Sequence, residues 1–326
     1  MRQHRAIRHV VWTVWTVALL AVASGLPTVP VVAQDSRAQP SVAAPLMDVE
    51  VRKGVEYVKH DGVVLTGDLY VPKAAGKYRV VVAVHGGGWQ GGNSGNYTSW
   101  GNWLSQRGTA LFAINYRLAK PGAPTYPQAV HDLRAAIQYV KAKAADLKID
   151  PERVALMGDS AGGHLVALVA LAGDTPTFAG AYKDDPHASV STKVKAVVGG
   201  YGIYDMAQQF EHDLTKRPQD QIVAKFLGKP VWEDRKLYFD ASPMSYALNA
   251  NRGPSFFLAY GTEDDIVDRE QSDKFLVALK QAGFYARNTV LQGFGHFWFT
   301  GDPVEDPRGA NAHFAPRLLR FFNERL

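Results

Sequence analysis

The 326-residue sequence contains no cysteine, so it has neither a disulfide framework nor a cysteine that could carry a lipid. Stability must therefore come from the hydrophobic core. No His or carboxylate cluster has the spacing of metal ligands, and we expect no metal and no cofactor. The sequence also lacks a basic patch with interleaved aromatic residues, which argues against a nucleic-acid partner.

The sequence has little excess charge outside its N-terminus. Its formal net charge is +5, and Arg2, Arg5 and Arg8 lie in the first 33 residues, which contain no acidic residue. Without these arginines, 33 basic residues remain against 31 acidic ones, a charge of +2. With 46% hydrophobic and 21% charged residues, the chain has the composition of an ordinary globular protein.

The N-terminus also lacks a hydrophobic run long enough for a comfortable membrane span. The apolar stretch of residues 10–23 falls short of the roughly 20 residues that a transmembrane helix needs. A basic start, a short apolar stretch and small residues up to Ala33 are typical of a secretory signal. We predict a signal peptide over residues 1–33, an uncleaved anchor being the alternative. Residues 34–48 are rich in Ala, Pro, Ser and Gln, and we expect them to form a flexible leader. Cleavage of the signal peptide would give a secreted or periplasmic protein with no stable membrane span.

Strands and helices alternate along residues 49–326. Residues 80–84 are apolar at every position, as in a strand covered by helices on both faces. Residues 129–145 place apolar side chains three and four positions apart, as on one face of a helix. This alternation predicts an α/β fold with a mostly parallel sheet, helices on both faces and an antiparallel opening hairpin. The expected strands are 49–58, 64–71, 80–84, 110–114, 154–157, 194–198, 256–260 and 287–291, and the expected helices are 129–145, 165–171, 272–282 and 312–326.

Residues 202–240 do not fit this alternation. They are polar and aromatic, with two helix-like pieces at about 204–210 and 219–227. We interpret this segment as a small cap-like excursion over the top of the sheet. A long connecting loop without a function is the alternative.

The strongest chemical signal is Gly158-Asp159-Ser160-Ala161-Gly162, which fits Gly-x-Ser-x-Gly. An expected strand precedes it and an expected helix follows it. On such a sharp turn glycines remove clashing side chains, and the serine hydroxyl is exposed at the top of the sheet. Ser160 is therefore the candidate nucleophile, and the alternative is a Gly/Ser turn without chemistry.

A serine nucleophile needs a base, and the base needs an acid that orients it. His296 is the candidate base because it lies in a Gly-rich loop directly after the last expected strand. Asp264 follows another buried strand and is our choice for the acid, with Asp265 as the second candidate. Glu263, Asp268 and Asp205 are weaker alternatives.

The loop His85-Gly86-Gly87-Gly88-Trp89 follows the strand at residues 80–84. Consecutive glycines let backbone amides approach a substrate oxygen without obstruction by side chains. With the amide of Ala161, the residue after the nucleophile, they could form an oxyanion hole. A phosphate-binding loop would need a following Lys-Ser/Thr pair, which the sequence lacks.

The ordered set of motifs resembles the α/β-hydrolase carboxylesterases over roughly residues 49–326. The motifs are His85-Gly86-Gly87-Gly88-Trp89, Asn115-Tyr116-Arg117-Leu118-Ala119, Gly158-Asp159-Ser160-Ala161-Gly162-Gly163, Ser242-Pro243, Gly261-Thr262-Glu263-Asp264 and Gly295-His296. The most similar groups are the feruloyl/acetyl-xylan-type esterases and the related hormone-sensitive-lipase-like esterases. The short leader, without cap helices, favours the first group.

The resemblance implies a triad of Ser160, Asp264 and His296, and oxyanion donors at Gly87, Gly88 and Ala161. The chain departs from the family at Asp265, where many members have proline. The sequence thus predicts a serine esterase for small-molecule esters with short acyl groups, among them acylated carbohydrates. A peptidase or amidase on the same fold is the alternative, and a non-catalytic ligand-binding homologue is a weaker one.

Two tryptophans are candidates for contacts with the substrate. Trp89 adjoins the glycine loop and Trp298 lies two residues after His296, so both are expected to line a pocket for an acyl or alcohol group. Core filling is the alternative for both, and it is the preferred interpretation for Phe297 and Phe299.

Overall fold

A computed structural model describes residues 45–326. The predicted signal peptide, 1–33, and residues 34–44 of the predicted leader lie outside the described residues. Within residues 45–326, no helix combines the length and apolar composition that a bilayer-spanning helix requires.

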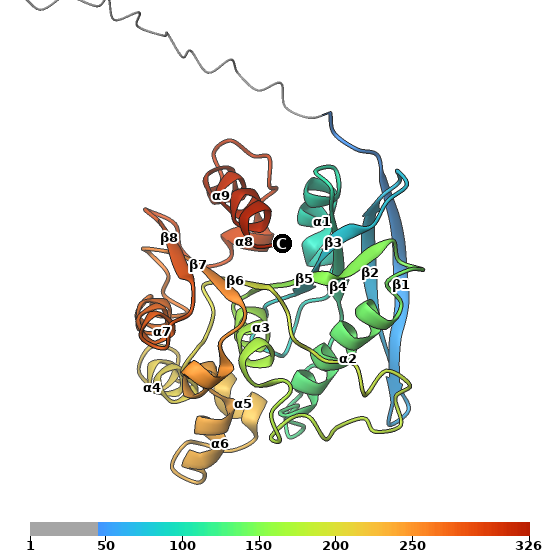
Figure 1. The fold of residues 1–326 in the computed structure, drawn as a ribbon. Helices are drawn as coiled ribbons and strands as arrows, with labels where there is room; N and C mark the ends of the chain where they lie inside the picture. Colours follow the sequence, from blue (N-terminus) through green and yellow to red (C-terminus); the bar gives the residue numbers. More distant parts are fainter. Residues whose placement is uncertain (1–44) are drawn as a thin grey trace, which may run out of the picture. The chain divides into compact units, whose positions relative to one another are not determined.

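The core of the fold is an eight-stranded sheet with the order β1-β2-β4-β3-β5-β6-β7-β8 (Figure 1). β1 and β2 form an antiparallel hairpin, and β2 also pairs antiparallel with β4. Every other neighbouring pair is parallel, so the predicted mostly parallel sheet with an antiparallel edge is confirmed. The strands are β1 (Val49–His60), β2 (Val63–Pro72), β3 (Tyr78–Val84), β4 (Thr109–Ile114), β5 (Ile149–Asp159), β6 (Ala196–Gly200), β7 (Ser255–Gly261) and β8 (Ala286–Leu291).

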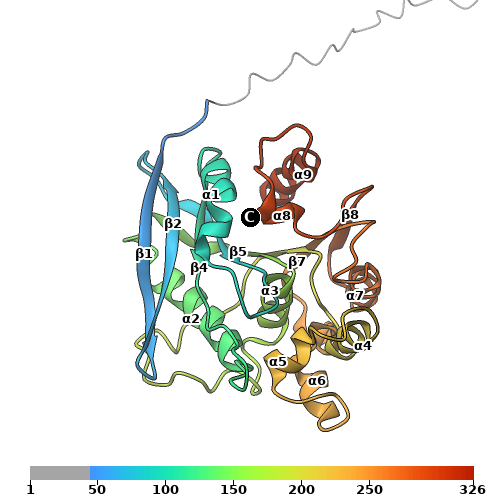
Figure 2. The same ribbon diagram turned by 180° about the vertical axis from the view of Figure 1, so that it is seen from behind.

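Helices cover both faces of the sheet. Figures 1 and 2 show α2, α3 and α7 on one face, and α1, α8 and α9 on the other. The helices are α1 (Thr98–Ser105), α2 (Gln128–Ala142), α3 (Ala161–Ala172), α4 (Met206–Lys216), α5 (Ile222–Leu227), α6 (Arg235–Ala241), α7 (Glu270–Gln281), α8 (Trp298–Gly301) and α9 (Ala310–Arg325). The four predicted helices are found as α2, α3, α7 and α9, with small shifts at their ends.

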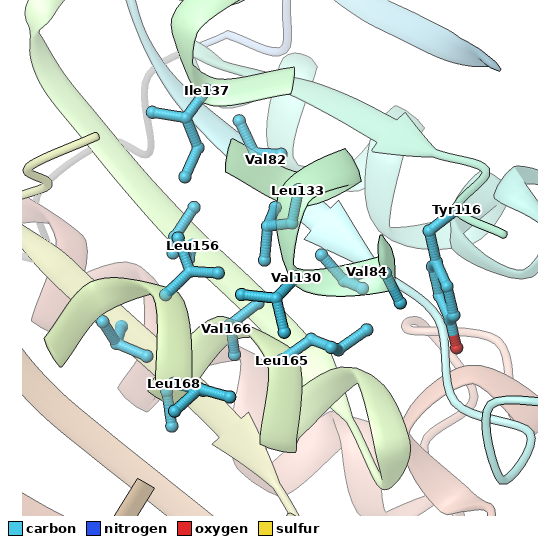
Figure 3. Packing of buried hydrophobic residues seen from close by; sticks show 14 of the residues in the cluster. Val82, Val84, Tyr116, Val130, Leu133, Ile137, Leu156, Leu165, Val166 and Leu168 are labelled. Atoms are coloured by element: carbon cyan, nitrogen blue, oxygen red, sulfur yellow. The ribbon is translucent and has the colours of Figure 1, made fainter. Parts of the chain in front are cut away.

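The two-sided cover explains the continuous apolar runs in the strands. Side chains alternate across a strand, so neighbouring residues of β3 enter different cores. Val82 and Val84 pack with α2 and α3, whereas Val81 and Ala83 pack with α1 and α9. Figure 3 shows Val82 and Leu156 of the sheet against Leu133 of α2 and the neighbouring side chains of α3.

Helix α1 was not predicted from the sequence. It is short and contains Gly101, a residue that weakens helices. The structure shows why glycine is used: a Cβ at Gly101 would lie 2.5 Å from the ring of Tyr70 on β2. The helix therefore depends on close packing against the sheet more than on local helix propensity.

The predicted excursion at residues 202–240 contains α4, α5 and most of α6. The two predicted helical pieces correspond to α4 and α5, and α6 was not predicted. Phe226 of α5 stacks on Trp89 with ring centroids 4.5 Å apart and an interplanar angle of 10°. The excursion thus packs against the glycine-rich loop after β3.

Candidate active site

Ser160 occupies a strained turn between β5 and α3. Its backbone has φ 52° and ψ −121°, a left-handed φ that non-glycine residues rarely adopt. The turn is tight enough that a Cβ at Gly162 would lie 1.9 Å from the carbonyl oxygen of Val84. The amide of Ser160 donates to the carbonyl oxygen of Gly200 at 2.8 Å, which fixes the turn against β6. Such strain, held by surrounding contacts, is typical of functional positions.

The structure brings Ser160, His296 and Asp264 into one hydrogen-bonded chain. The Nε2 atom of His296 lies 3.0 Å from Ser160 Oγ, and its Nδ1 lies 2.7 Å from Asp264 Oδ2. The side chains of His296 and Asp264 are only 2% and 1% exposed. With Nδ1–H donating to the carboxylate, Nε2 is free to accept the serine proton.

The two neighbouring aspartates that the sequence offered lie in different places. Asp264 Oδ1 accepts from the amides of Ile266 and Val267 at 3.0 and 2.9 Å, which orients its Oδ2 toward His296. Asp265 is exposed, and its backbone oxygen lies 3.1 Å from His212 Nε2. The geometry therefore favours Asp264 as the orienting acid.

The loops after β7 and β8 are joined by backbone hydrogen bonds. The amide of Thr262 donates to Leu291 O at 3.0 Å, and the amide of Glu263 donates to Phe294 O at 3.0 Å. A Cβ at Gly261 would lie 1.9 Å from Phe294 O, so only glycine permits this approach. These contacts hold Asp264 and His296, which are 32 positions apart, at a fixed separation.

The predicted oxyanion donors lie at two adjoining turns. Gly87 and Gly88 have φ values of +108° and +59°, and Ala161 begins α3. Within residues 45–326, the amides of these three residues donate to no protein acceptor. Unpaired amides beside a nucleophile are the arrangement that a developing oxyanion needs.

Asp159, to which the sequence assigned no role, connects the glycine loop to the serine turn. Its Oδ1 accepts from the amide of Gly86 at 3.1 Å and from the hydroxyl of Tyr97 at 2.9 Å. Burial raises the pKa of this carboxyl, while the Tyr97 and Gly86 hydrogen bonds oppose that rise. The sequence signal for this contact was the acidic residue directly before the serine, because a carboxyl buried there requires hydrogen-bond partners.

Aromatic rings pack against the imidazole of His296. Tyr201, which also has a positive φ of 37°, lies with its ring centroid 4.2 Å from that of His296. Phe297 contacts the same imidazole edge-to-face at 4.7 Å. Tyr201 was not predicted as a site residue, because its position depends on the bend after β6.

The two predicted pocket tryptophans belong to the core, which corrects their assignment to substrate contacts. Trp89 is 0% exposed because Phe226 of α5 covers it, and Trp298 is 3% exposed because it packs on Phe314 of α9. Phe299 is fully buried, as expected for a residue that fills the core. Phe297 was also expected to fill the core, but it is 64% exposed.

Trp89 is joined to the end of α6 through His164 on α3. Its indole Nε1 donates to His164 Nδ1 at 3.2 Å, so His164 Nε2 carries the proton and donates to Ala241 O at 2.8 Å. Burial lowers the pKa of His164 to about 4. The ring is therefore neutral near pH 7, as both hydrogen bonds require.

Exchanging His164 for asparagine tests this buried contact. The folded pKa lies below the value of about 6.5 of an unfolded histidine, so the unfolded chain binds the proton first as pH falls. His164 should thus lower the stability of the wild type between about pH 6.5 and 4, by up to about 3 kcal/mol. An asparagine side chain cannot titrate, so the stability deficit of His164→Asn should shrink as pH falls through this range. Urea unfolding of both proteins at several pH values measures this, and a constant deficit would contradict it.

A cavity of about 610 Å³ lies away from the triad. Its wall includes Pro151 near the start of β5, Lys195 directly before β6 and Pro254 directly before β7, whereas Ser160 lies after the end of β5. Among residues 45–326, no three His, Cys, Asp or Glu side chains are grouped as a metal site requires.

Comparison with known proteins gives a match to one protein family. Residues 67–279 match the family model BD-FAE. A probable carboxylic ester hydrolase of Mycobacterium tuberculosis, LipM, is 32% identical over 205 residues, 62% of this chain and 45% of that protein. Esterase LipQ of the same organism is 31% identical over 55% of this chain and 40% of that protein. The chain thus spans less than half the length of these curated relatives.

Solved structures show the same fold. An esterase of Thermogutta terrifontis has a TM-score of 0.64 and 24% identity, covering 85% of this chain and 91% of its own. An acetyl ester-xyloside bifunctional hydrolase of Caldicellulosiruptor lactoaceticus has a TM-score of 0.68 and 22% identity, covering 87% of this chain and 98% of its own. At these identities the likeness establishes the fold, and it confirms the α/β-hydrolase architecture predicted from the sequence.

Proposed function

The chain belongs to the BD-FAE family, and from this premise we propose that it is a serine carboxylic-ester hydrolase. The observation that carries the proposal is the hydrogen-bonded chain from Ser160 through His296 to Asp264. The relatives named as ester hydrolases support the same reaction class. Ser160, His296 and Asp264 are the proposed triad, and Gly87, Gly88 and Ala161 are the proposed oxyanion donors.

The reaction follows from this arrangement. His296 Nε2 takes the proton of Ser160 as Oγ bonds to the ester carbonyl carbon, and the carbonyl oxygen becomes an anion facing the amides of Gly87, Gly88 and Ala161. His296 then gives the proton to the leaving alcohol, and the serine keeps the acyl group. Water, deprotonated by His296, releases the acid in a second cycle. Base catalysis contributes about 10²–10⁴-fold, and each oxyanion donor about 10²–10³-fold.

A matched substrate pair tests the reaction class. Purified protein should hydrolyse p-nitrophenyl acetate and ethyl acetate, and it should hydrolyse acetanilide and peptide substrates far more slowly. Faster cleavage of the amides would assign the protein to the amidases or peptidases. Specific binding of esters without any turnover would indicate a non-catalytic homologue.

We further propose a preference for short acyl groups, because α5 packs beside the oxyanion loop. A Cβ at Gly88 would lie 3.2 Å from Ile222 Cγ2, and Ile222 is itself almost fully buried. A longer acyl chain needs a continuous apolar groove, in which each buried methylene contributes about 0.8 kcal/mol. The packing of Ile222 against the loop leaves little depth for such a groove.

The acyl-chain profile checks this preference. For wild-type protein, kcat/KM on p-nitrophenyl esters should be highest from acetyl to butyryl and should fall toward palmitoyl. Ile222→Ala removes side-chain volume beside Gly88 and should shift the maximum toward longer chains. A steady rise of wild-type kcat/KM toward palmitoyl would contradict the proposal.

Export of the protein remains a proposal that the sequence of residues 1–33 supports. A secreted or periplasmic esterase would meet small-molecule esters outside the cytoplasm. Size comparison of the exported and the intracellular protein would show whether this segment is removed.

A further inference from the structure

Phe297 is an exposed aromatic residue directly beside the proposed catalytic base. Its side chain is 64% exposed, whereas the following residues, Trp298 and Phe299, are 3% and 0% exposed. Its φ of 69° is an outlier for a bulky residue. An exposed phenyl ring in a strained conformation next to His296 has no role in the core.

The outward orientation of Phe297 is fixed by the segment that follows it. Asn311 of α9 donates through Nδ2 to the carbonyl oxygens of Trp298 and Phe299 at 3.0 and 3.1 Å. Trp100 Nε1 donates to the same oxygen of Phe299 at 2.8 Å. These buried contacts hold the start of α8, so the exposed ring is built into the fold.

The chemistry of the reaction determines which part of an ester meets this ring. His296 must pass its proton to the oxygen of the leaving alcohol, so that alcohol lies against the imidazole. Phe297 packs edge-to-face on the imidazole with ring centroids 4.7 Å apart and an interplanar angle of 88°. The acyl chain is attached to the carbonyl carbon, which lies between Ser160 Oγ and the amides near Gly88. Phe297 thus adjoins the alcohol part of the substrate.

We propose that Phe297 is a specificity-determining residue that binds the alcohol part of the ester through a flat aromatic ring. This inference rests on the proposed esterase function and names its substrate class as esters of aromatic alcohols. The phenyl side chain offers only an apolar ring, and aromatic rings pair favourably in offset-stacked or edge-to-face geometries. The buried Trp89 and Trp298 cannot supply such a surface.

Acetates of three alcohols provide the test: benzyl alcohol, cyclohexylmethanol and ethanol. They share one acyl group and have alcohols of similar acidity, so kcat/KM reports differences in binding of the alcohol part. In Phe297→Ala, kcat/KM for benzyl acetate should fall about tenfold more than for ethyl acetate. Phe297→Tyr should keep the wild-type preference for benzyl over cyclohexylmethyl acetate. Phe239→Ala is the matched control, because Phe239 on α6 is a phenylalanine that is 62% exposed.

Two outcomes would overturn the proposal. An equal loss on all three acetates in Phe297→Ala would mean that the ring only supports His296. Unchanged kcat/KM on all three acetates would mean that the ring does not touch the alcohol.

Binding in a Ser160→Ala background separates this inference from the proposed function. Benzyl acetate binding, followed by ligand-observed NMR, should weaken about tenfold when Phe297→Ala is added. Equal affinity of the two proteins would overturn the role of Phe297 even if the wild type is an esterase. A wild type that hydrolyses no ester would instead overturn the proposed function, while this binding measurement would still decide the role of Phe297.

Discussion

Ser160→Ala should lower kcat for p-nitrophenyl acetate by a factor on the order of 10⁶, the size of effect seen when a triad serine is removed. The serine Oγ hydrogen-bonds to His296 at 3.0 Å, and no other atom of the side chain can form the acyl-enzyme. The fold should remain, because the backbone amide keeps its bond to Gly200 O and an alanine at this position meets the same backbone strain as serine. Steady-state kinetics and thermal unfolding measure the two effects.

The control for this prediction is a serine outside the site. Ser191 lies between β5 and β6 and bonds to Asp174, so Ser191→Ala should keep near wild-type kcat. Turnover retained in Ser160→Ala would remove Ser160 from the mechanism. A collapse of the thermal transition in that variant would show a structural role instead.

Asp264→Asn should lower kcat by about 10⁴-fold, the effect expected when the orienting acid of a triad loses its charge. An amide in place of Asp264 Oδ2 can present its NH₂ group to His296 Nδ1, which favours the tautomer with a proton on Nε2. That tautomer cannot accept the proton of Ser160. Steady-state kcat of the purified variant measures the loss.

Asp265→Asn is the matched control for the acid. The same chemical change one residue away falls on an exposed side chain, so it should alter kcat only slightly. Equal losses in the two variants, or a larger loss in Asp265→Asn, would contradict the assignment of Asp264.

The strands of the sheet could be predicted from local sequence patterns, because helices cover the sheet on both faces. Residues 80–84 are apolar throughout, and the structure places alternate side chains in the two cores. The antiparallel opening hairpin could also be predicted, because its strands β1 and β2 are neighbours in the sequence. Helix α1 escaped prediction because its stability depends on the contact between Gly101 and Tyr70, which come from separate segments.

The candidate triad was predictable because each member lies in the first turn or loop after a strand. The carboxyl ends of parallel strands meet at one edge of a sheet, where sites form. The environment of the aromatic residues was not predictable in this way. Trp89 is buried because Phe226, 137 positions later, stacks on it. Phe297 is exposed because Trp298 and Phe299 are held by α9 and α1.

The hydrogen-bond partners of the buried polar side chains could also not be predicted from local sequence patterns. Asp159 is oriented by Gly86 and Tyr97, and His164 by Trp89 and Ala241. Each of these contacts joins segments more than 60 positions apart. Sequence spacing places a side chain on an element, but only packing determines which polar groups it meets.

Covalent labelling tests the central claim, that Ser160 is a nucleophile activated by His296. The purified protein is treated with a serine-directed phosphonate, and intact mass and peptide mapping locate the adduct. We expect one phosphonyl group per chain, attached to Ser160, with labelling slowed strongly in His296→Ala. Absence of a label, or a label on another residue, would contradict the account.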